Sequence, residues 1–280
     1  MQGKTVVITG ATSGIGAVAA ERLAGQGARL LLIARDPRRA ATTLARMEQI
    51  APGMGHRIYE ADLSRLSEMK RVAEEIAAAE PRIDVLINNA GALFNARRLT
   101  EDGLERTFAL NHMAYFLLTC GLIHRIKAAA PARIVNTASD AHRGARLNFA
   151  DLQGENRYEG YKAYGRSKLC NILFTRELAR RLVGTGVTAN CLHPGFVATR
   201  FGDEAGGPVA LIIRGLKLFA ISPEEGAKTI VYLASSPAVA ASSGGYFYKC
   251  QSATPTTEAQ DDSAAAQLWA ESARIAGIDL

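Results

Sequence analysis

The stretch "TVVITGATSGIG", Thr5–Gly16, decides the fold of this chain. It starts as an apolar, β-branched run typical of a buried strand and continues into glycines where a helical pattern begins. Glycines in such a turn let the backbone approach a phosphate, and the positive end of the helix attracts it. The spacing G-x-x-x-G-x-G departs from the usual dinucleotide fingerprint G-x-G-x-x-G, and a purely structural turn is the alternative. We predict a dinucleotide site formed by Gly10, Thr12, Ser13, Gly14, Ile15 and Gly16.

Short apolar runs alternate with longer amphipathic stretches along the rest of the chain. The runs predict strands near Thr5–Thr9, Arg29–Ala34, His56–Glu60, Val85–Asn88, Arg133–Thr137, Val187–Leu192 and Gly245–Tyr248. The stretches between them predict helices near Ile15–Gln26, Arg38–Ile50, Ser67–Ala79, Gly103–Lys127, Tyr161–Leu182 and Pro223–Ser235. Such alternation is typical of an α/β fold, and continuous apolar strands indicate a sheet covered on both faces. We expect a doubly wound parallel sheet (Rossmann fold) of about seven strands in a single domain over residues 1–280.

Two segments lie outside this alternation. Residues 202–221 open with the glycine-rich "GDEAGG" and become apolar, so we interpret them as a segment that covers the substrate; a surface helix packed on the core is the alternative. Residues 256–276 follow Pro255, are rich in alanine and carry acidic residues early, which predicts a C-terminal helix.

Composition narrows the class of function. The net charge of +6 comes from scattered residues without a basic stripe interleaved with aromatics, which makes nucleic acid an unexpected partner. The four cysteines and five histidines show no metal-ligand spacing, so we predict no metal site. No signal peptide and no apolar segment long enough to cross a bilayer is recognisable, and we expect a cytoplasmic protein without an integral membrane segment.

The choice of cofactor depends on the end of the second predicted strand. There Ala34 is followed by Arg35 and Asp36. A carboxylate at position 34 would bond a ribose 2′-hydroxyl and repel a 2′-phosphate, whereas an arginine forms a charge-assisted bond with that phosphate. We therefore predict NADP(H) rather than NAD(H), with Arg35 as the contact. The alternative is that Arg35 and Asp36 only solvate a loop.

A serine, a tyrosine and a lysine occur in one polar stretch further along. Tyr164 and Lys168 are four positions apart on a predicted helix and so lie on one face. The Lys168 cation, together with a nicotinamide cation, would favour the phenolate of a group whose pKa is ordinarily about 10. Ser139 directly follows a predicted strand that ends at the same edge of the sheet, where its hydroxyl could bond a substrate oxygen. These residues indicate hydride transfer at a nicotinamide with a protein acid or base.

The motif set resembles that of the short-chain dehydrogenase/reductase superfamily over essentially the whole chain. The matching motifs are TGxxxGxG, NNAG (Asn88–Gly91), Asn111, Ser139, YxxxK and PGxVxT (Pro194–Thr199). The resemblance implies that Tyr164 is the general acid/base, that Lys168 binds the nicotinamide ribose and that Ser139 orients the substrate oxygen. It also implies that Asn111 holds a water that links Lys168 to solvent.

The same resemblance assigns the remaining cofactor contacts. Asp62 and Leu63 are expected to flank the adenine, and Asn89, Ala90 and Gly91 to lie at the adenosine ribose and sheet centre. The nicotinamide end is expected to contact Pro194, Gly195, Val197 and Thr199.

Ser139 and Tyr164 are 25 positions apart, about twice the usual spacing in the superfamily. This longer loop and the ending "AQLWAESARIAG" resemble the retinol dehydrogenase-like branch, whose members usually use NADP(H) and act on apolar alcohols and aldehydes. The implied activity is that of a carbonyl reductase or alcohol dehydrogenase with an apolar small-molecule substrate. His142 in this loop could shape the substrate mouth, and a structural or solvated role is the preferred interpretation.

Parts of this pattern are also compatible with two other functions and with a homodimer. A non-catalytic NADP(H)-binding redox sensor or scaffold protein is the main alternative, and the presence of both Tyr164 and Lys168 argues against it. A sugar-nucleotide epimerase is disfavoured by the short tail after Tyr248. A homodimer through the two long predicted helices, Gly103–Lys127 and Tyr161–Leu182, is slightly favoured.

Overall fold

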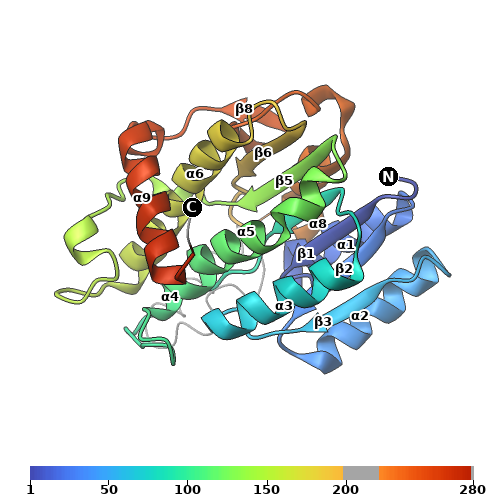
Figure 1. The fold of residues 1–280 in the computed structure, drawn as a ribbon, viewed down its shortest axis with the longest axis horizontal. Coiled ribbons are helices and arrows are strands. Elements are labelled where there is room, and N and C mark those ends of the chain that lie inside the picture. Colours follow the sequence, from blue (N-terminus) through green and yellow to red (C-terminus); the bar gives the residue numbers. More distant parts are fainter. Residues whose placement is uncertain (198–220, 279–280) are drawn as a thin grey trace.

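The computed structural model of the protein describes residues 1–197 and 221–278, and within these residues eight strands form one sheet (Figure 1). Their order across the sheet is β3-β2-β1-β4-β5-β6-β7-β8. The strands are β1 (Thr5–Thr9), β2 (Arg29–Ala34), β3 (Arg57–Glu60), β4 (Val85–Asn88), β5 (Ala132–Thr137), β6 (Val187–Leu192), β7 (Tyr246–Tyr248) and β8 (Gln251–Ala253). All neighbours pair in parallel except β7 and β8, which are antiparallel.

Helices lie between the strands and cover both faces of the sheet (Figure 1). They are α1 (Gly14–Gly25), α2 (Pro37–Ile50), α3 (Leu66–Ala79), α4 (Arg106–Phe108), α5 (Ala114–Lys127), α6 (Gly160–Arg181), α8 (Pro223–Ser235) and α9 (Asp262–Ala276). The predicted doubly wound α/β fold is therefore confirmed. Within the described residues, no helix is both long enough and apolar enough to span a bilayer.

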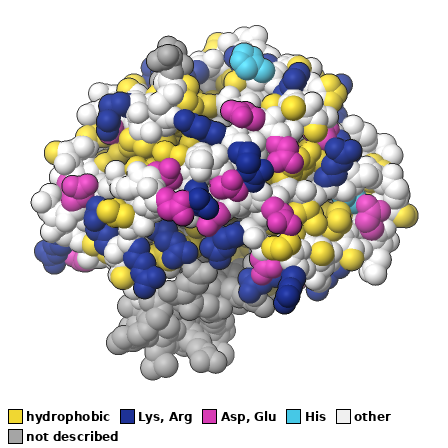
Figure 2. Space-filling view, turned by 60° about the horizontal axis from the view of Figure 1, so that its bottom comes forward, with side chains coloured by type: hydrophobic (Ala, Val, Ile, Leu, Met, Phe, Trp, Pro, Cys, Tyr) yellow, Lys and Arg dark blue, Asp and Glu magenta, His cyan; other side chains and the backbone are white. Residues whose placement is uncertain are grey.

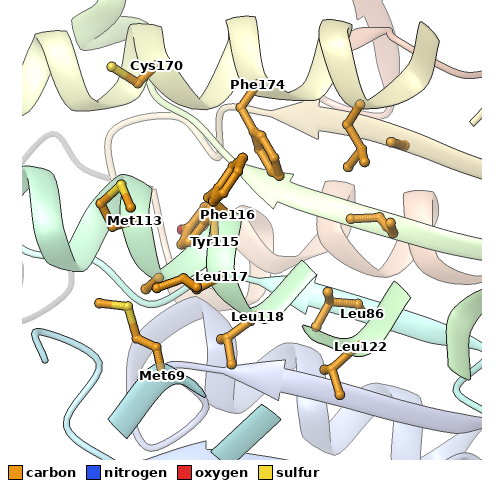
Figure 3. Close-up of a cluster of buried hydrophobic side chains, with 14 of the residues drawn as sticks. Met69, Leu86, Met113, Tyr115, Phe116, Leu117, Leu118, Leu122, Cys170 and Phe174 are labelled. Carbon is orange, nitrogen blue, oxygen red and sulfur yellow. The ribbon is translucent and has the colours of Figure 1, made fainter. Parts of the chain in front are cut away.

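Alternate residues of each strand enter two separate cores, as the period of a strand requires. One core holds Val7 and Leu86 together with side chains of α3, α5, α6 and α9. The other holds Val6 and Ile8 with side chains of α1 and α8. In the first core, Phe116 of α5 meets Phe174 of α6 with ring centroids 5.9 Å apart (Figure 3). Both faces of the central strands are thus buried, which explains why they read as continuous apolar runs.

The long helix predicted over Gly103–Lys127 differs from the structure at its beginning. Glu105 has an extended backbone, and its carboxylate accepts hydrogen bonds from the N–H groups of Thr107 and Phe108, so the helix begins at Arg106. A π-helical segment, Ala109–Met113, then precedes α5. The sequence pattern did not predict this widened turn, which contains Asn111.

The C-terminal elements also differ from the prediction. The helix expected over 256–276 begins at Asp262, because Asp261 caps it by accepting from the N–H groups of Ser263 and Ala264. Strand β8 was not predicted: it is short and polar, and its hairpin turn consists of Lys249 and Cys250, both at positive φ, rather than the usual Asn or Gly.

The strand order changes direction between β1 and β4. The connection after β1 leads to β2 on one side, and the connection after β3 returns to β4 on the other. Loops at the carboxyl ends of the two strands therefore diverge and leave a crevice, the usual ligand site of an open α/β sheet. The predicted site residues follow the ends of these strands and of their neighbours.

Candidate active site

The glycine turn after β1 lies against the loop after β4. Gly10 has φ +70°, and a Cβ added there would stand 2.8 Å from Ala90 Cα. A Cβ on Gly16 would stand 2.5 Å from Asn89 Nδ2. The Asn89 amide donates to the carbonyls of Thr9 at 3.2 Å and Gly10 at 3.3 Å. These glycines are therefore required by close backbone packing, and they bring Asn89 and Ala90 next to the start of α1.

Thr9 is a contact that sequence reasoning missed. Its hydroxyl accepts hydrogen bonds from the N–H groups of Asn89 and Ala90, both at 2.9 Å, and thereby fixes the separation of the two loops. The signal in the sequence is a hydroxyl residue that ends an apolar strand directly before the glycine turn.

Arg35 lies directly after β2, and its side chain is exposed. The Asp36 carboxylate caps α2, because it accepts hydrogen bonds from the N–H groups of Arg38 at 3.0 Å and Arg39 at 3.2 Å. The neighbouring carboxylate is thus committed to a helix end. This leaves Arg35 as the charged side chain that immediately follows the strand.

Asp62 and Leu63 follow β3, beside the end of β2, where the N–H of Ala61 donates to the Ala34 carbonyl at 3.0 Å. Asp62 Oδ1 accepts from the N–H and hydroxyl of Ser64, and the Leu63 side chain is buried in the core beside α3. Both residues are therefore held beside the end of β2, next to Arg35; their contact with an adenine stays a prediction.

Helix α6 carries Tyr164 and Lys168 to the end of β5. Lys168 Nζ donates to the Thr137 carbonyl at 2.9 Å and lies 5.6 Å from the centroid of the Tyr164 ring. The Ser139 and Tyr164 side chains share a hydrogen bond. The three groups that were predicted to act together are therefore gathered in one place.

Asn111 reaches the same place from the π-helical segment. Its Nδ2 donates to the Ala92 carbonyl and to Ser167 Oγ, both at 2.9 Å, and its Oδ1 accepts from the Ala92 N–H at 2.9 Å. A Cβ on Gly91 would stand 3.2 Å from Asn111 Oδ1 and 3.3 Å from Lys168 Nζ. Gly91 thus lets the loop after β4 pass between Asn111 and Lys168.

Burial dominates the electrostatics of this cluster. It lowers the pKa of Lys168 to about 7, since charging an enclosed ammonium is costly. It raises the pKa of Tyr164 well above the ordinary value, and the hydrogen bond with Ser139 opposes that rise. The protein alone therefore favours a neutral phenol, and a positive charge placed beside it would bring its ionisation back toward neutral pH.

The loop after β6 closes the other end of the site. Gly195 has φ +90°, and the Gly195 N–H donates to His193 Nδ1 at 3.2 Å. A Cβ on Gly226 of α8 would meet Val197 at 2.7 Å and Ile15 at 2.8 Å, so the predicted contacts Ile15 and Val197 both lie against the same glycine. Thr199, and residues 202–220 of the predicted covering segment, lie outside the described residues.

The sequence also led to an expectation about metal ligands and cysteines. Across residues 1–197 and 221–278, no group of three or more His, Cys, Asp or Glu side chains is placed to hold a metal ion. The four cysteines are free thiols.

Charges of both signs are mixed on the face of the molecule seen in Figure 2. There Lys and Arg side chains are interspersed with Asp and Glu side chains.

The residues present suit a dinucleotide. The turn after β1 has Gly10 and Gly14 at positive φ and leads into the N-terminus of α1, where free backbone N–H groups attract a phosphate. Tyr164, Lys168 and Ser139 lie at the end of β5, two strands away along the same edge of the sheet. A ligand with phosphates at one end and a reactive ring at the other suits this arrangement.

Comparison with known proteins agrees with this geometry. The family model described as short chain dehydrogenase matches residues 4–207. The chain is 43% identical to mouse retinol dehydrogenase 14 over 293 residues, which covers 99% of this chain and 87% of the relative. It is 40% identical to human retinol dehydrogenase 13 over 291 residues, with 99% and 86% covered.

Solved structures show the same fold. A protein of uncharacterised function from Mycobacterium paratuberculosis matches with a TM-score of 0.79 and 32% identity, covering 99% of this chain and 95% of the other. RhlG of Pseudomonas aeruginosa, solved as an NADP active-site complex, matches with a TM-score of 0.69 and 29% identity over 88% and 94%. The chain therefore belongs to the short-chain dehydrogenase/reductase family of oxidoreductases, which bind a nicotinamide cofactor, and within it to the retinol dehydrogenase-like branch.

Proposed function

We propose that the protein is an NADP(H)-dependent oxidoreductase that interconverts an apolar alcohol and its aldehyde or ketone, with Tyr164 as the general acid/base. The observation that carries the proposal is the contact of Tyr164 with Ser139 and Lys168 at the carboxyl edge of the sheet. The bound nicotinamide supplies or accepts the hydride. Tyr164 gives its phenolic proton to the carbonyl oxygen in reduction and removes the hydroxyl proton in oxidation.

The other residues of the cluster assist this proton transfer. In the proposal, Ser139 donates a hydrogen bond to the substrate oxygen and holds it beside the phenol. Lys168, when protonated, favours the phenolate, because its ammonium lies 5.6 Å from the ring centroid. Asn111 holds the loop that contains Gly91 beside Lys168 through its two hydrogen bonds to the Ala92 backbone.

An apolar substrate is supported by the side chains near the cluster and by the relatives. Leu93 packs on Tyr164 with Ala141 beside it, and two exposed aromatic residues, Tyr161 and Phe196, stand on α6 and on the loop after β6. Retinol, named in the relatives, is an apolar alcohol. The cytoplasmic location and the homodimer stay predictions.

Replacing Tyr164 by Phe tests the reaction. We expect turnover of a medium-chain aldehyde with NADPH to fall by about 100- to 10,000-fold, because a positioned general acid contributes that much. NADPH affinity, measured by fluorescence titration, should stay within a few-fold. Wild-type turnover retained in this variant would reject the mechanism, and cofactor binding by a wild-type protein that turns over no aldehyde, ketone or alcohol would favour the redox-sensor function.

Replacing Arg35 by Ala tests the choice of cofactor. We expect kcat/KM for NADPH to fall about 10- to 100-fold, since a hydrogen bond to a charged group contributes about 1.5–3 kcal/mol. The value for NADH should change little, because NADH has no 2′-phosphate. Arg57→Ala, an exposed arginine at the opposite end of a strand, is the matched control. An equal loss with both cofactors would count against Arg35 as the phosphate contact.

A further inference from the structure

His142 is completely buried at the end of the 3₁₀ turn Asp140–His142, which directly follows Ser139. Its Nδ1 lies 2.7 Å from the Ser139 carbonyl oxygen, and its Nε2 lies 3.3 Å from the backbone nitrogen of Thr256. A carbonyl only accepts and a backbone N–H only donates. Nδ1 therefore carries the hydrogen and Nε2 is the acceptor, which describes a neutral imidazole; burial also lowers the pKa of His142.

Hydrogen bonds within this turn hold both the carbonyl and the hydroxyl of Ser139. Its carbonyl accepts from the His142 N–H at 3.2 Å as well as from Nδ1. Its hydroxyl accepts from the Ala141 N–H at 3.2 Å and shares a hydrogen bond with Tyr164. A shift of the Ser139 backbone would therefore move the hydroxyl relative to the phenol.

The His142 ring also joins Ser139 to the loop after β6. It packs edge-on against Tyr246 of β7 at 5.3 Å, and Tyr246 is stacked with His193 at 5.8 Å. His193 in turn lies flat on Tyr248 at 4.0 Å and accepts from the Gly195 N–H. These four rings form a continuous column between the residue proposed to orient the substrate oxygen and the loop proposed to hold the nicotinamide end.

We propose that His142 is a positioning residue for the reaction: its Nδ1–H holds the Ser139 carbonyl, anchored through Nε2 to Thr256, and so fixes the Ser139 hydroxyl against Tyr164. This inference rests on the proposed function. His142 acts through Ser139 and does not itself touch the reacting atoms.

Two substitutions separate the two hydrogen bonds. In His142→Asn, the side-chain amide nitrogen occupies the place of Nδ1 and can still donate to Ser139. In His142→Gln, the amide lies one bond further out, where it can meet Thr256 but cannot donate to Ser139. Both variants lose the ring and its contact with Tyr246, so the loss of the ring cannot account for a difference between them.

We expect kcat with NADPH and an aldehyde to stay within about 3-fold of wild type in His142→Asn and to fall about 10- to 100-fold in His142→Gln, since a small misplacement of a reacting group costs up to 100-fold. NADPH affinity should change little in either variant, and their melting temperatures should be similar. A residue that only supports packing would lower stability in both and would not separate their kcat values.

Equal kcat in the two variants overturns the inference, whether both match wild type or both fall. Should His142→Gln not fold, His142→Leu replaces it, because leucine has the shape of asparagine without the donor; its kcat should fall while that of His142→Asn is kept, and equal values overturn the inference. Tyr164→Phe is run alongside. Undiminished turnover in that variant rejects the proposed function itself, a result that the His142 variants cannot produce.

Discussion

At the scale of single residues, the enclosed charge of Lys168 governs the site before any ligand binds. Its side chain is buried on α6, and its Nζ donates a hydrogen bond to the Thr137 carbonyl. Enclosure lowers its pKa from 10.5 to about 7. The folded protein thus releases a proton at Lys168 that the unfolded chain still holds, and a bound ligand that favours the ammonium would reverse this.

This shift predicts how stability depends on pH. Because the folded-state pKa is lowered, the penalty of burying the charge is complete below pH 7 and disappears above pH 10.5. Between these values the free energy of unfolding should rise with pH, by roughly 5 kcal/mol in total. In Lys168→Met this contribution is absent. From about pH 7 to pH 9 the free energy of unfolding of wild type should therefore rise relative to that of the variant.

Urea unfolding of the cofactor-free protein across that range measures the gap. Lys162→Met, an exposed lysine on the same helix, is the matched control and should leave the pH dependence unchanged. A constant difference between Lys168→Met and wild type over this range would contradict the prediction.

At the scale of elements, close packing of α6 against the turn after β5 sets the distance between Tyr164 and Ser139. Gly165 lies between Tyr164 and Lys168 on the helix, and a Cβ there would stand 2.5 Å from the Ala141 carbonyl oxygen. That oxygen belongs to the backbone of the 3₁₀ turn, so it cannot swing aside as a flexible side chain would. The glycine lets the helix approach the turn that carries Ser139 and His142.

Gly165→Ala should therefore destabilise the protein by about 1–3 kcal/mol, as overpacking does, despite the better helix propensity of alanine. It should also reduce kcat, because the turn that holds Ser139 is pushed away from Tyr164. Urea unfolding and steady-state kinetics measure the two effects. Gly25→Ala, near the end of α1, is the matched control, since its nearest neighbour is a side-chain methyl of Ile50 at an ordinary 3.4 Å. Wild-type stability and kcat in Gly165→Ala would contradict the argument.

At the scale of the whole molecule, the parallel sheet collects residues from distant parts of the chain at one edge. The loops after β1, β4, β5 and β6 all leave from the carboxyl ends of neighbouring strands. Two cores, one on each face, hold the sheet between its helices. The reactive cluster therefore needs no domain closure within the described residues to bring Tyr164, Ser139 and Lys168 together.

Much of this could be predicted because its signals are local. An apolar run such as Val6–Ile8 marks a buried strand, a glycine such as Gly10 marks a close approach, and the spacing of Tyr164 and Lys168 places both on one helical face. The strand β8 had no such signal, since it is only three residues long, two of them, Gln251 and Ser252, are polar and exposed, and its pairing depends on an uncommon hairpin turn. The π-helical turn around Asn111 likewise depends on contacts with Ala92 and Ser167 that no periodicity encodes.

The sequence by itself determined the alternation of strands and helices and the family, and it predicted the candidate trio Ser139, Tyr164 and Lys168, because each rests on residue types in recognisable patterns. Only the tertiary structure decided the role of His142, whose partner Thr256 is 114 positions away, and the column of rings that it joins. Hydrogen bonds and ring contacts act over a few ångströms in space, so they follow the packing of distant segments rather than their order along the chain.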